Sequence, residues 1–174
     1  MADHGVTGVL LVGGASRRFG APKALARLDG ETLAERAWRV LGEACDERIA
    51  VGKVADGITL PFPLLDDGTP VRAPIAGVVA GLRAAGNDVC VVLPVDCPLI
   101  SADSLRRLAH KATAVSPTGP LPGAFRRSDL PLLERKLSTG EYSLRDVPAT
   151  VVELDEGELV NVNTAADLSA LTAP

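Results

Sequence analysis

Residues 7–23 read TGVLLVGGASRRFGAPK, and this stretch decides the fold. Its first part, Thr7 to Val12, is a continuous apolar run, which is typical of a strand buried on both faces of a parallel sheet. Gly13 and Gly14 follow at the carboxyl end of that strand, where glycine lets the backbone approach a ligand closely. We therefore predict a ligand-binding loop directly after the first strand.

The charges of this loop indicate what it binds. Arg17, Arg18 and Lys23 supply positive potential beside backbone amides, a combination that suits phosphate groups. The loop is not a Walker A motif, because no Lys-Ser or Lys-Thr follows Gly20, and its glycines do not have the GxGxxG spacing. The sequence thus predicts a phosphate cradle of another type, and chemistry alone does not choose between the two arginines.

The chain beyond the loop alternates helical and strand patterns. Thr32 with Glu35 forms a capping box before an apolar helix face, and Ile75 to Leu82 has helical spacing. Val89 to Val95 is a second continuous apolar run. A short predicted strand, Arg48 to Val51, lies between the two runs. This order predicts an α/β protein: a single-domain, Rossmann-like three-layer sandwich with a mostly parallel sheet, spanning residues 1–174.

The downstream part carries weaker signals. Ser101 and Ser128 are candidate N-caps for two further helices, and Thr150 to Leu154 resembles a strand. Proline and glycine cluster between Pro117 and Gly123, which indicates a loop. Ala166 to Leu171 predicts a closing helix.

Composition excludes several function classes. The chain has 174 residues with 47% hydrophobic and 23% charged residues, as expected for a globular domain. A net charge of −4 and only 3% aromatic residues disfavour nucleic-acid binding. The apolar runs are too short to span a membrane, and Cys45, Cys90 and Cys97 are expected to be free thiols in the cytoplasm.

Asp96 stands at the carboxyl end of the second buried strand, in the sequence LPVDCPL from Leu93 to Leu99. In a parallel sheet, this end faces the same crevice as the glycine loop. Mg²⁺ prefers oxygen ligands and is often held by one or two carboxylates together with phosphates and water. Asp96 is therefore a candidate magnesium ligand, or alternatively a residue that only caps the following turn.

Two further stretches carry candidate binding residues. Pro74 to Gly77 starts a helix with small residues that allow a flat ring to lie close, and the Asp66-Asp67 pair upstream has acceptors for a base. Asn161 and Asn163 are two residues apart on an extended segment, so their amides point to one side. Each stretch also has a purely structural interpretation, as a packed helix start or a helix cap.

Taken together, these stretches resemble the nucleotidyltransferase family typified by molybdenum cofactor guanylyltransferase. The matches keep the family's order and cover nearly the whole chain. The segment LVGGASRRFGAPK, at residues 11–23, matches the family pattern LAGGxSxRMGxxK. APIAG, at residues 73–77, matches GPLAG, and DCPL, at residues 96–99, matches DxPL. NVNTAADL, at residues 161–168, matches NVNTPEDL.

The resemblance implies that a terminal phosphate of an acceptor attacks the α-phosphorus of a nucleoside triphosphate and releases pyrophosphate. It implies Mg²⁺ at Asp96, and catalytic roles for Lys23, Arg18 and Asp96. The implied acceptor contacts are Asn161 and Asn163. The implied nucleotide contacts are Leu11, Gly13, Gly14, Lys23, Asp66, Asp67, Pro74, Gly77 and Asp96.

The favoured substrates under this resemblance are GTP and a phosphorylated small molecule, molybdopterin, in the cytoplasm. Transient contact with cofactor-biosynthesis or molybdoenzyme partners is also expected, whereas nucleic acid and membranes are not. Two alternatives remain open: transfer to a sugar phosphate or another phosphorylated metabolite, and a silent nucleotide-binding module in which Pro22 and Ala73 mark lost catalysis. A Rossmann oxidoreductase fits less well, because its glycine fingerprint is absent.

Overall fold

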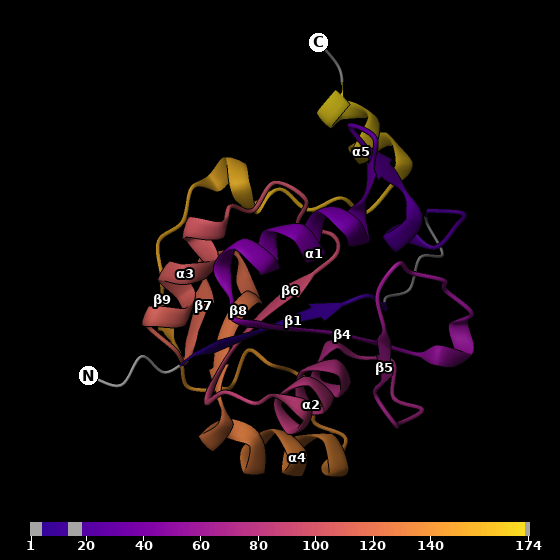
Figure 1. Cartoon of the computed structure of the whole chain (residues 1–174). Helices are drawn as coiled ribbons and strands as arrows, with labels where there is room; N and C mark the ends of the chain where they lie inside the picture. The colour runs from indigo at the N-terminus through magenta and orange to yellow at the C-terminus, as the bar shows by residue number, and fades with distance from the viewer. Residues whose placement is uncertain (1–4, 14–18, 173–174) are drawn as a thin grey trace.

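A computed structural model of the chain describes residues 5–13 and 19–172. Its middle layer is a seven-stranded sheet with the order β5-β4-β1-β6-β8-β7-β9 (Figure 1). The pairs β5-β4, β4-β1, β1-β6 and β7-β9 are parallel, and β8 is antiparallel to both of its neighbours. The predicted α/β sandwich with a mostly parallel sheet is therefore confirmed. The strands are β1 (Val6–Leu11), β4 (Glu47–Gly52), β5 (Leu64–Asp66), β6 (Val89–Pro94), β7 (Ala114–Ser116), β8 (Gly119–Arg126) and β9 (Thr150–Val151).

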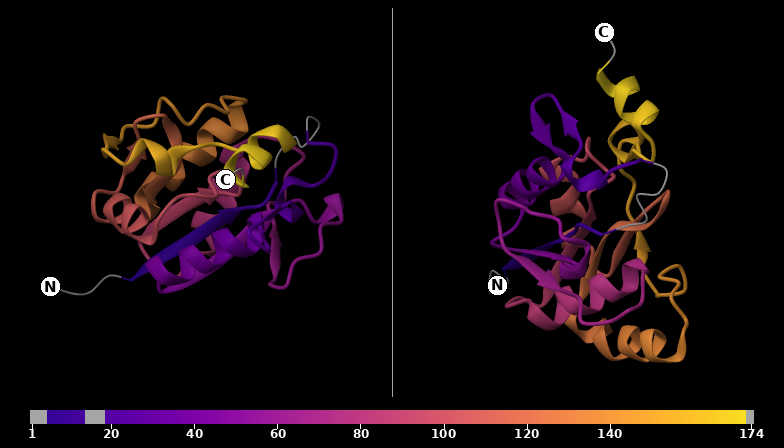
Figure 2. Two further views of the ribbon diagram at one scale, coloured as in Figure 1. Left: turned by 90° about the horizontal axis from the view of Figure 1, so that it is seen from above. Right: turned by 90° about the vertical axis from the view of Figure 1, so that its right-hand side faces the viewer.

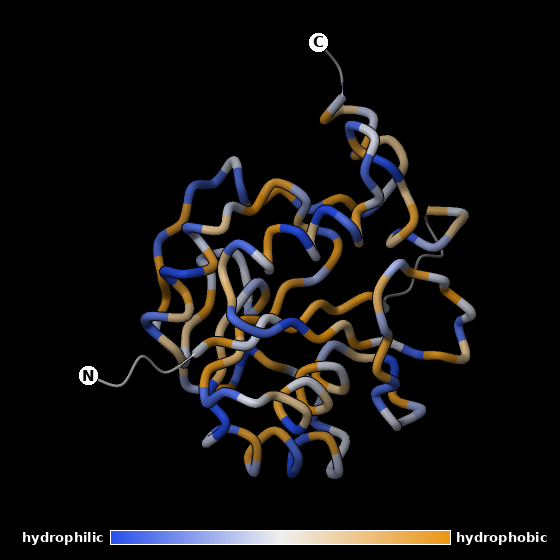
Figure 3. The backbone as a smooth tube through the Cα atoms, viewed as in Figure 1, coloured by the Kyte–Doolittle hydropathy of each residue, from blue (hydrophilic) through white to orange (hydrophobic). Residues whose placement is uncertain are grey.

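Helices cover both faces of this sheet. α1 and α3 pack side by side on one face, and α2 and α4 on the other (Figure 1). Successive side chains of a strand point to opposite faces. Leu10 of β1 therefore packs in the core beneath α1 and α3, and Val9 and Leu11 pack in the core beneath α2 and α4. Hydrophobic residues accordingly run along the central strands (Figure 3). The helices are α1 (Leu33–Ala44), α2 (Pro74–Ala84), α3 (Ala102–His110), α4 (Leu130–Thr139) and α5 (Ala165–Thr172).

The start of α1 shows the predicted capping box. Glu35 N donates to Thr32 Oγ1 over 3.1 Å, and Thr32 N donates to Glu35 Oε2 over 2.9 Å. The hydrogen bond from the Thr32 backbone is the main reason that the pKa of Glu35 lies below its usual value. Two otherwise unpaired donors at the helix start are thereby satisfied, which sets where α1 begins.

Three elements, β2 (Arg27–Leu28), β3 (Glu31–Thr32) and α5, lie outside the main sheet. A small antiparallel hairpin of β2 and β3 precedes α1, and α5 lies beside it although the two are far apart in sequence (Figure 2). No helix within residues 5–13 and 19–172 has the length and hydrophobicity needed to cross a bilayer.

Three sequence predictions in the second half were wrong. The segment 117–123 is only partly a loop, because β8 begins at Gly119. Ser128 does not cap α4: it lies in a short 3₁₀ helix, η4 (Arg127–Asp129), and Asp129 takes the N-cap position of α4. The final strand, β9, has two residues instead of five. For β8 and β9, pairing with β7 decided the extent of the strand over local pattern.

Gly123 is placed where no side chain fits. A Cβ atom at this position would lie 2.4 Å from the Pro120 carbonyl oxygen and 3.0 Å from that of Ala114. Both are backbone atoms of the sheet, so they cannot move aside as a flexible side chain does. We expect Gly123→Ala to destabilise the protein by about 1–3 kcal/mol, measured by urea denaturation.

Gly119 on the same strand is the matched control. A Cβ there would meet only Arg145 Nη2, at 3.9 Å, which is ordinary van der Waals distance. Gly119→Ala should therefore change the free energy of unfolding by no more than about 0.5 kcal/mol. Equal effects of the two substitutions would show that the close approach at Gly123 does not restrict the residue there.

Candidate nucleotide-binding site

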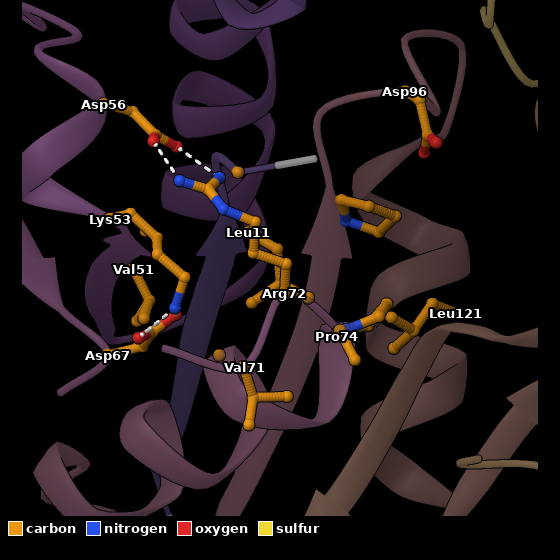
Figure 4. Close-up of a pocket in the computed structure, with 15 residues that line it drawn as sticks. Leu11, Val51, Lys53, Asp56, Asp67, Val71, Arg72, Pro74, Asp96 and Leu121 are labelled. Atoms are coloured by element: carbon orange, nitrogen blue, oxygen red, sulfur yellow. Dashed lines mark hydrogen bonds and ion pairs between the residues drawn. The ribbon is translucent and has the colours of Figure 1, made fainter. Parts of the chain in front are cut away.

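The carboxyl ends of β1, β4 and β6 meet at one edge of the sheet. Leu11 of β1 is in register with Val51 of β4 and with Pro94 of β6. A cavity of about 300 Å³ opens at this edge, lined by these three residues and by the loops that follow the strands (Figure 4). Ligands of open parallel sheets bind at such carboxyl ends, so this cavity is the candidate functional site.

Small residues bring α2 against the floor of the cavity. Pro74 is the first residue of α2, where its fixed φ suits the helix and its missing N–H costs no hydrogen bond. Gly77 follows within the first turn, and a Cβ there would lie 2.6 Å from Leu11 Cδ2. Gly77 therefore lets the helix approach β1, and Pro74, Gly77, Leu11 and Gly13 all line the cavity.

An ion pair forms part of one wall. Lys53, directly after β4, donates from Nζ to both carboxylate oxygens of Asp67 over 2.7 Å and to the Thr69 carbonyl oxygen over 2.5 Å. Their side chains are only 13% and 7% exposed. Because the pair is shielded from water, its charges act strongly on anything that enters the cavity.

A second pair lies further along the same wall. Arg72, in the connection to α2, donates to both carboxylate oxygens of Asp56 over 2.7 and 3.2 Å. Asp56 belongs to a short 3₁₀ helix, η3 (Val54–Asp56). The hydrogen bonds from Arg72 hold the pKa of Asp56 below its usual value. Figure 4 shows both pairs on the wall opposite Asp96 and Leu121.

Lys23, Asp96 and Asn163 come together on the other side. Lys23 Nζ lies 3.8 Å from Asp96 Oδ2 and donates to Asn163 Oδ1 over 3.4 Å. Lys23 starts a short 3₁₀ helix, η2 (Lys23–Leu25), and Asp96 follows β6. Their side chains are 16% and 31% exposed, so an ammonium group and a carboxylate stand next to each other with access to solvent.

Backbone and side-chain contacts hold the segment 161–163 against this cluster. Val162 N donates to the Asp96 carbonyl oxygen over 2.8 Å, and the Cys97 thiol donates to Asn161 Oδ1 over 3.0 Å. Burial raises the pKa of the Cys97 thiol, and the neighbouring Asp96 carboxylate adds to this effect. The thiol therefore stays protonated and serves as a donor.

A carboxylate further upstream anchors the same segment. Glu158, in a 3₁₀ helix, η5 (Glu156–Leu159), accepts hydrogen bonds at Oε2 from Ser101 N, Ser101 Oγ and Ser104 Oγ over 3.1, 3.0 and 2.6 Å. Ser101 is the N-cap of α3, as predicted. The start of α3 and the approach to Asn161 are thus fixed to each other.

Most of the predicted site residues are brought together by the fold. Those that line the cavity are Leu11, Gly13, Asp67, Pro74, Gly77 and Asp96. Lys23 contacts Asn163 and lies 3.8 Å from Asp96, and Asn161 contacts the adjacent Cys97. Gly14 and Arg18 lie outside the described residues.

Asp66, unlike its neighbour Asp67, points into the loops next to the cavity. Its carboxylate accepts hydrogen bonds from Val54 N and Gly68 N, each over 2.8 Å, and it does not line the cavity. These two backbone donors hold the pKa of Asp66 below its usual value. Asp66 therefore organises the loops around η3, and Asp67 faces the cavity.

Sequence reasoning missed three charged residues of the cavity wall: Lys53, Asp56 and Arg72. Lys53 had a usable signal, because it comes directly after the predicted strand Arg48 to Val51, at the end where ligands bind. Asp56 and Arg72 had none, since they are brought together by loops that carry no periodic pattern.

The described residues contain no group of three or more His, Cys, Asp or Glu side chains arranged to hold a metal ion. Asp96 alone offers a solvent-accessible carboxylate on the cavity side that faces Lys23. Such a carboxylate suits an ion that takes its other ligands from water and substrate phosphates, as Mg²⁺ does.

The family model and the curated relatives agree on one family. A family model described as a MobA-like NTP transferase domain matches residues 8–154. A probable molybdenum cofactor guanylyltransferase of Chloroflexus aggregans is 31% identical, covering 97% of this chain and 94% of its own length. One of Opitutus terrae is 37% identical, covering 84% of this chain and 79% of its own.

A solved structure supports the fold. The molybdopterin-guanine dinucleotide biosynthesis protein A from Archaeoglobus fulgidus superposes with a TM-score of 0.79, at 23% identity, over 95% of this chain and 96% of that one. At 23% identity, the superposition shows that the two proteins share their fold and shows nothing further.

Proposed function

The chain belongs to the MobA-like NTP transferase family and is a nucleotidyltransferase, and from this premise we propose that it transfers GMP from GTP to molybdopterin with Mg²⁺ as its metal. The names of relatives that span nearly the whole chain support GTP and molybdopterin as substrates. The observation that carries the proposal is the meeting of Lys23 and Asp96 at a cavity whose far wall presents Asp67.

The reaction exchanges one phosphoanhydride bond for another. An oxygen of the terminal phosphate of molybdopterin attacks the α-phosphorus of GTP, and the bond from this phosphorus to the bridging oxygen breaks. Pyrophosphate leaves with that electron pair. Such transfers depend on positioning and charge neutralisation, which oriented cationic groups supply without a covalent intermediate.

Lys23 and Asp96 are the catalytic residues in this proposal. The Lys23 ammonium stabilises negative charge on the α-phosphoryl oxygens and on the leaving pyrophosphate. Asp96 holds Mg²⁺, which when bound neutralises phosphate charge. The sequence pattern of the glycine loop supports a role for Arg18 in stabilising the same phosphate charge, and for the backbone of Gly14 in holding the base and ribose.

Lys53 and Asp67 are proposed to select guanine. The Watson–Crick edge of guanine has an acceptor, O6, beside two donors, N1–H and N2–H₂. The carboxylate of Asp67 offers acceptors for N1–H and N2–H₂. The ammonium of Lys53 directs its three N–H groups to Asp67 and Thr69, and one of them turns from Asp67 to O6 when guanine binds. Adenine has the opposite arrangement, with a donor at N6 and an acceptor at N1. With adenine, the buried groups of Lys53 and Asp67 would face like groups of the base and stay unpaired, which disfavours binding of adenine.

Asn161 and Asn163 are proposed to face the acceptor. Both side chains are exposed, and both amides stand beside the Asp96 loop, where the α-phosphate is expected. Amide groups offer donors and acceptors to phosphate and to a polar heterocycle.

The test measures pyrophosphate release with GTP, CTP, ATP or UTP in the presence of Mg²⁺, with and without molybdopterin. We expect release that requires both GTP and molybdopterin, and no release when EDTA removes the metal. Ligand-induced thermal stabilisation with each nucleotide reports binding separately from turnover.

Each other outcome corrects a defined part of the proposal. GTP binding without release would indicate a different acceptor, such as a sugar phosphate, or a silent module. Selective stabilisation by CTP would reject the role of Lys53 and Asp67 in choosing guanine. Release that persists in EDTA would reject the metal.

A further inference from the structure

A second groove lies between the last two turns of α3 and the edge strand β9. It has a volume of about 470 Å³. α3 and β9 lie on the left in Figure 1, across the molecule from β5. None of the residues that line the nucleotide cavity lines this groove. A molecule bound in this groove would leave the nucleotide cavity open.

The groove is basic although the chain as a whole is acidic, with a net charge of −4. Four residues of the α3 end line it: Arg106, Arg107, His110 and Lys111. Among the described residues that line it, Glu153 is the only one with a carboxylate. Within residues 5–13 and 19–172, none of the four basic residues forms an ion pair.

The two arginines keep most of their hydrogen-bonding capacity. Arg106 Nη2 donates to the Glu43 carbonyl oxygen and Arg107 Nη2 to that of Glu153, each over 2.6 Å. A guanidinium has five N–H donors, so one bond leaves four. These bonds fix where the arginines stand without neutralising them, since a carbonyl carries no net charge.

No other strand among the described residues pairs with the outer edge of β9, the strand that borders the groove. Thr150 N and Val152 N donate to Thr113 O and Val115 O on the β7 side, both over 2.9 Å. Because hydrogen bonding alternates along a parallel strand, the N–H and C=O of Val151 point away from β7. The Val151 side chain is 58% exposed. An unpaired strand edge of this kind accepts a further strand.

We infer that this groove binds an extended acidic segment of a partner protein, which adds as a strand along β9. The backbone of the segment pairs with Val151, and its carboxylates face the basic end of α3. Since side chains of a strand alternate between its two faces, the carboxylates must stand at every second position. A nucleic acid would use the charges but lacks the peptide groups that match the strand edge.

The probe is a fluorescein-labelled octapeptide in which Glu alternates with Val or Thr, compared with a block isomer of equal composition. Binding is followed by fluorescence anisotropy at low ionic strength. We expect the alternating peptide to bind at least about tenfold more tightly than the block isomer, because only its carboxylates align with the groove. Amide hydrogen exchange at Val151 should slow when the alternating peptide binds.

Two variants test the two halves of the inference. Lys111→Glu reverses an exposed charge and should weaken binding of the alternating peptide about tenfold, as expected for a facing charge. Val151→Pro removes the outward N–H and should lower the affinity for the alternating peptide to that for the block isomer. Arg135→Glu, an exposed arginine on α4, is the matched control and should change affinity less than about twofold.

Several results would overturn the inference. They are equal binding of the two isomers, no effect of Lys111→Glu, no binding of the alternating peptide, or unchanged exchange at Val151. Tighter binding of a single-stranded oligonucleotide at the same groove would favour nucleic acid instead. Thermal melts of both variants establish that they are folded, and Lys111→Glu decides the charge requirement even if Val151→Pro does not fold.

Discussion

Asp96→Asn is expected to lower the turnover of GTP and molybdopterin about 1000-fold, because it removes the proposed carboxylate ligand of Mg²⁺. The substitution keeps the size of the side chain and removes its charge. The side chain is 31% exposed and lies 3.8 Å from Lys23 Nζ, so its ion pair adds little to stability. The defect should therefore appear in catalysis, with a melting temperature within about 4 °C of the wild-type value.

Asp88→Asn is the matched control for Asp96→Asn. Asp88 immediately precedes β6, whereas Asp96 follows it, and Asp88 Oδ1 lies 3.9 Å from Arg127 Nε in a comparably loose ion pair. It stands at the opposite end of the strand from the cavity. Pyrophosphate release, measured against Mg²⁺ concentration, should be near normal in this variant. Normal turnover in Asp96→Asn would remove Asp96 from the metal site.

Lys23→Met should lower kcat about 100- to 1000-fold, with a much smaller change in the affinity for GTP. Methionine keeps a long apolar side chain but has no charge to stabilise the leaving pyrophosphate. Because charge on the phosphates grows as the bond to the leaving group breaks, the ammonium acts more strongly on the transition state than on bound GTP. Single-turnover kinetics with molybdopterin measures the chemical step, and thermal shift with GTP measures binding.

Lys111→Met is the comparison for Lys23→Met. Lys111 is an exposed lysine that caps the C-terminal end of α3 and does not line the nucleotide cavity, and the substitution makes the same chemical change there. Its effect on turnover should be less than about twofold, as expected for a surface residue far from the cavity. A Lys23→Met enzyme that binds GTP poorly but has normal single-turnover rates would make Lys23 a binding residue only.

Local pattern predicted the elements whose environment is simple. β1 and β6 are buried on both faces, so their continuous apolar runs are sufficient to identify them. The start of α1 is decided within four residues by Thr32 and Glu35. The positions of Gly13 and Asp96 at the ends of β1 and β6 placed both at one edge, because parallel strands share their direction.

Pairing between distant segments decided the rest of the sheet. β8 begins inside a stretch that its prolines and glycines marked as a loop, since Val89 to Val92 of β6 and the strand β7 both pair with β8. β5 has three residues and no pattern of its own, and its parallel pairing with β4 defines it. Short strands gain their stability from neighbours, which local propensity does not record.

The candidate site divides in the same way. The sequence alone determined that a glycine-rich loop with basic residues and a carboxylate follow two buried strands of an α/β protein, because periodicity and strand direction are local properties. Only the tertiary structure decided that Asp67 and not Asp66 faces the cavity, that Lys53 and Arg72 share its wall, and that Asn163 reaches Lys23. Those contacts join residues up to 140 positions apart, and they depend on how loops pack, which no periodic pattern encodes.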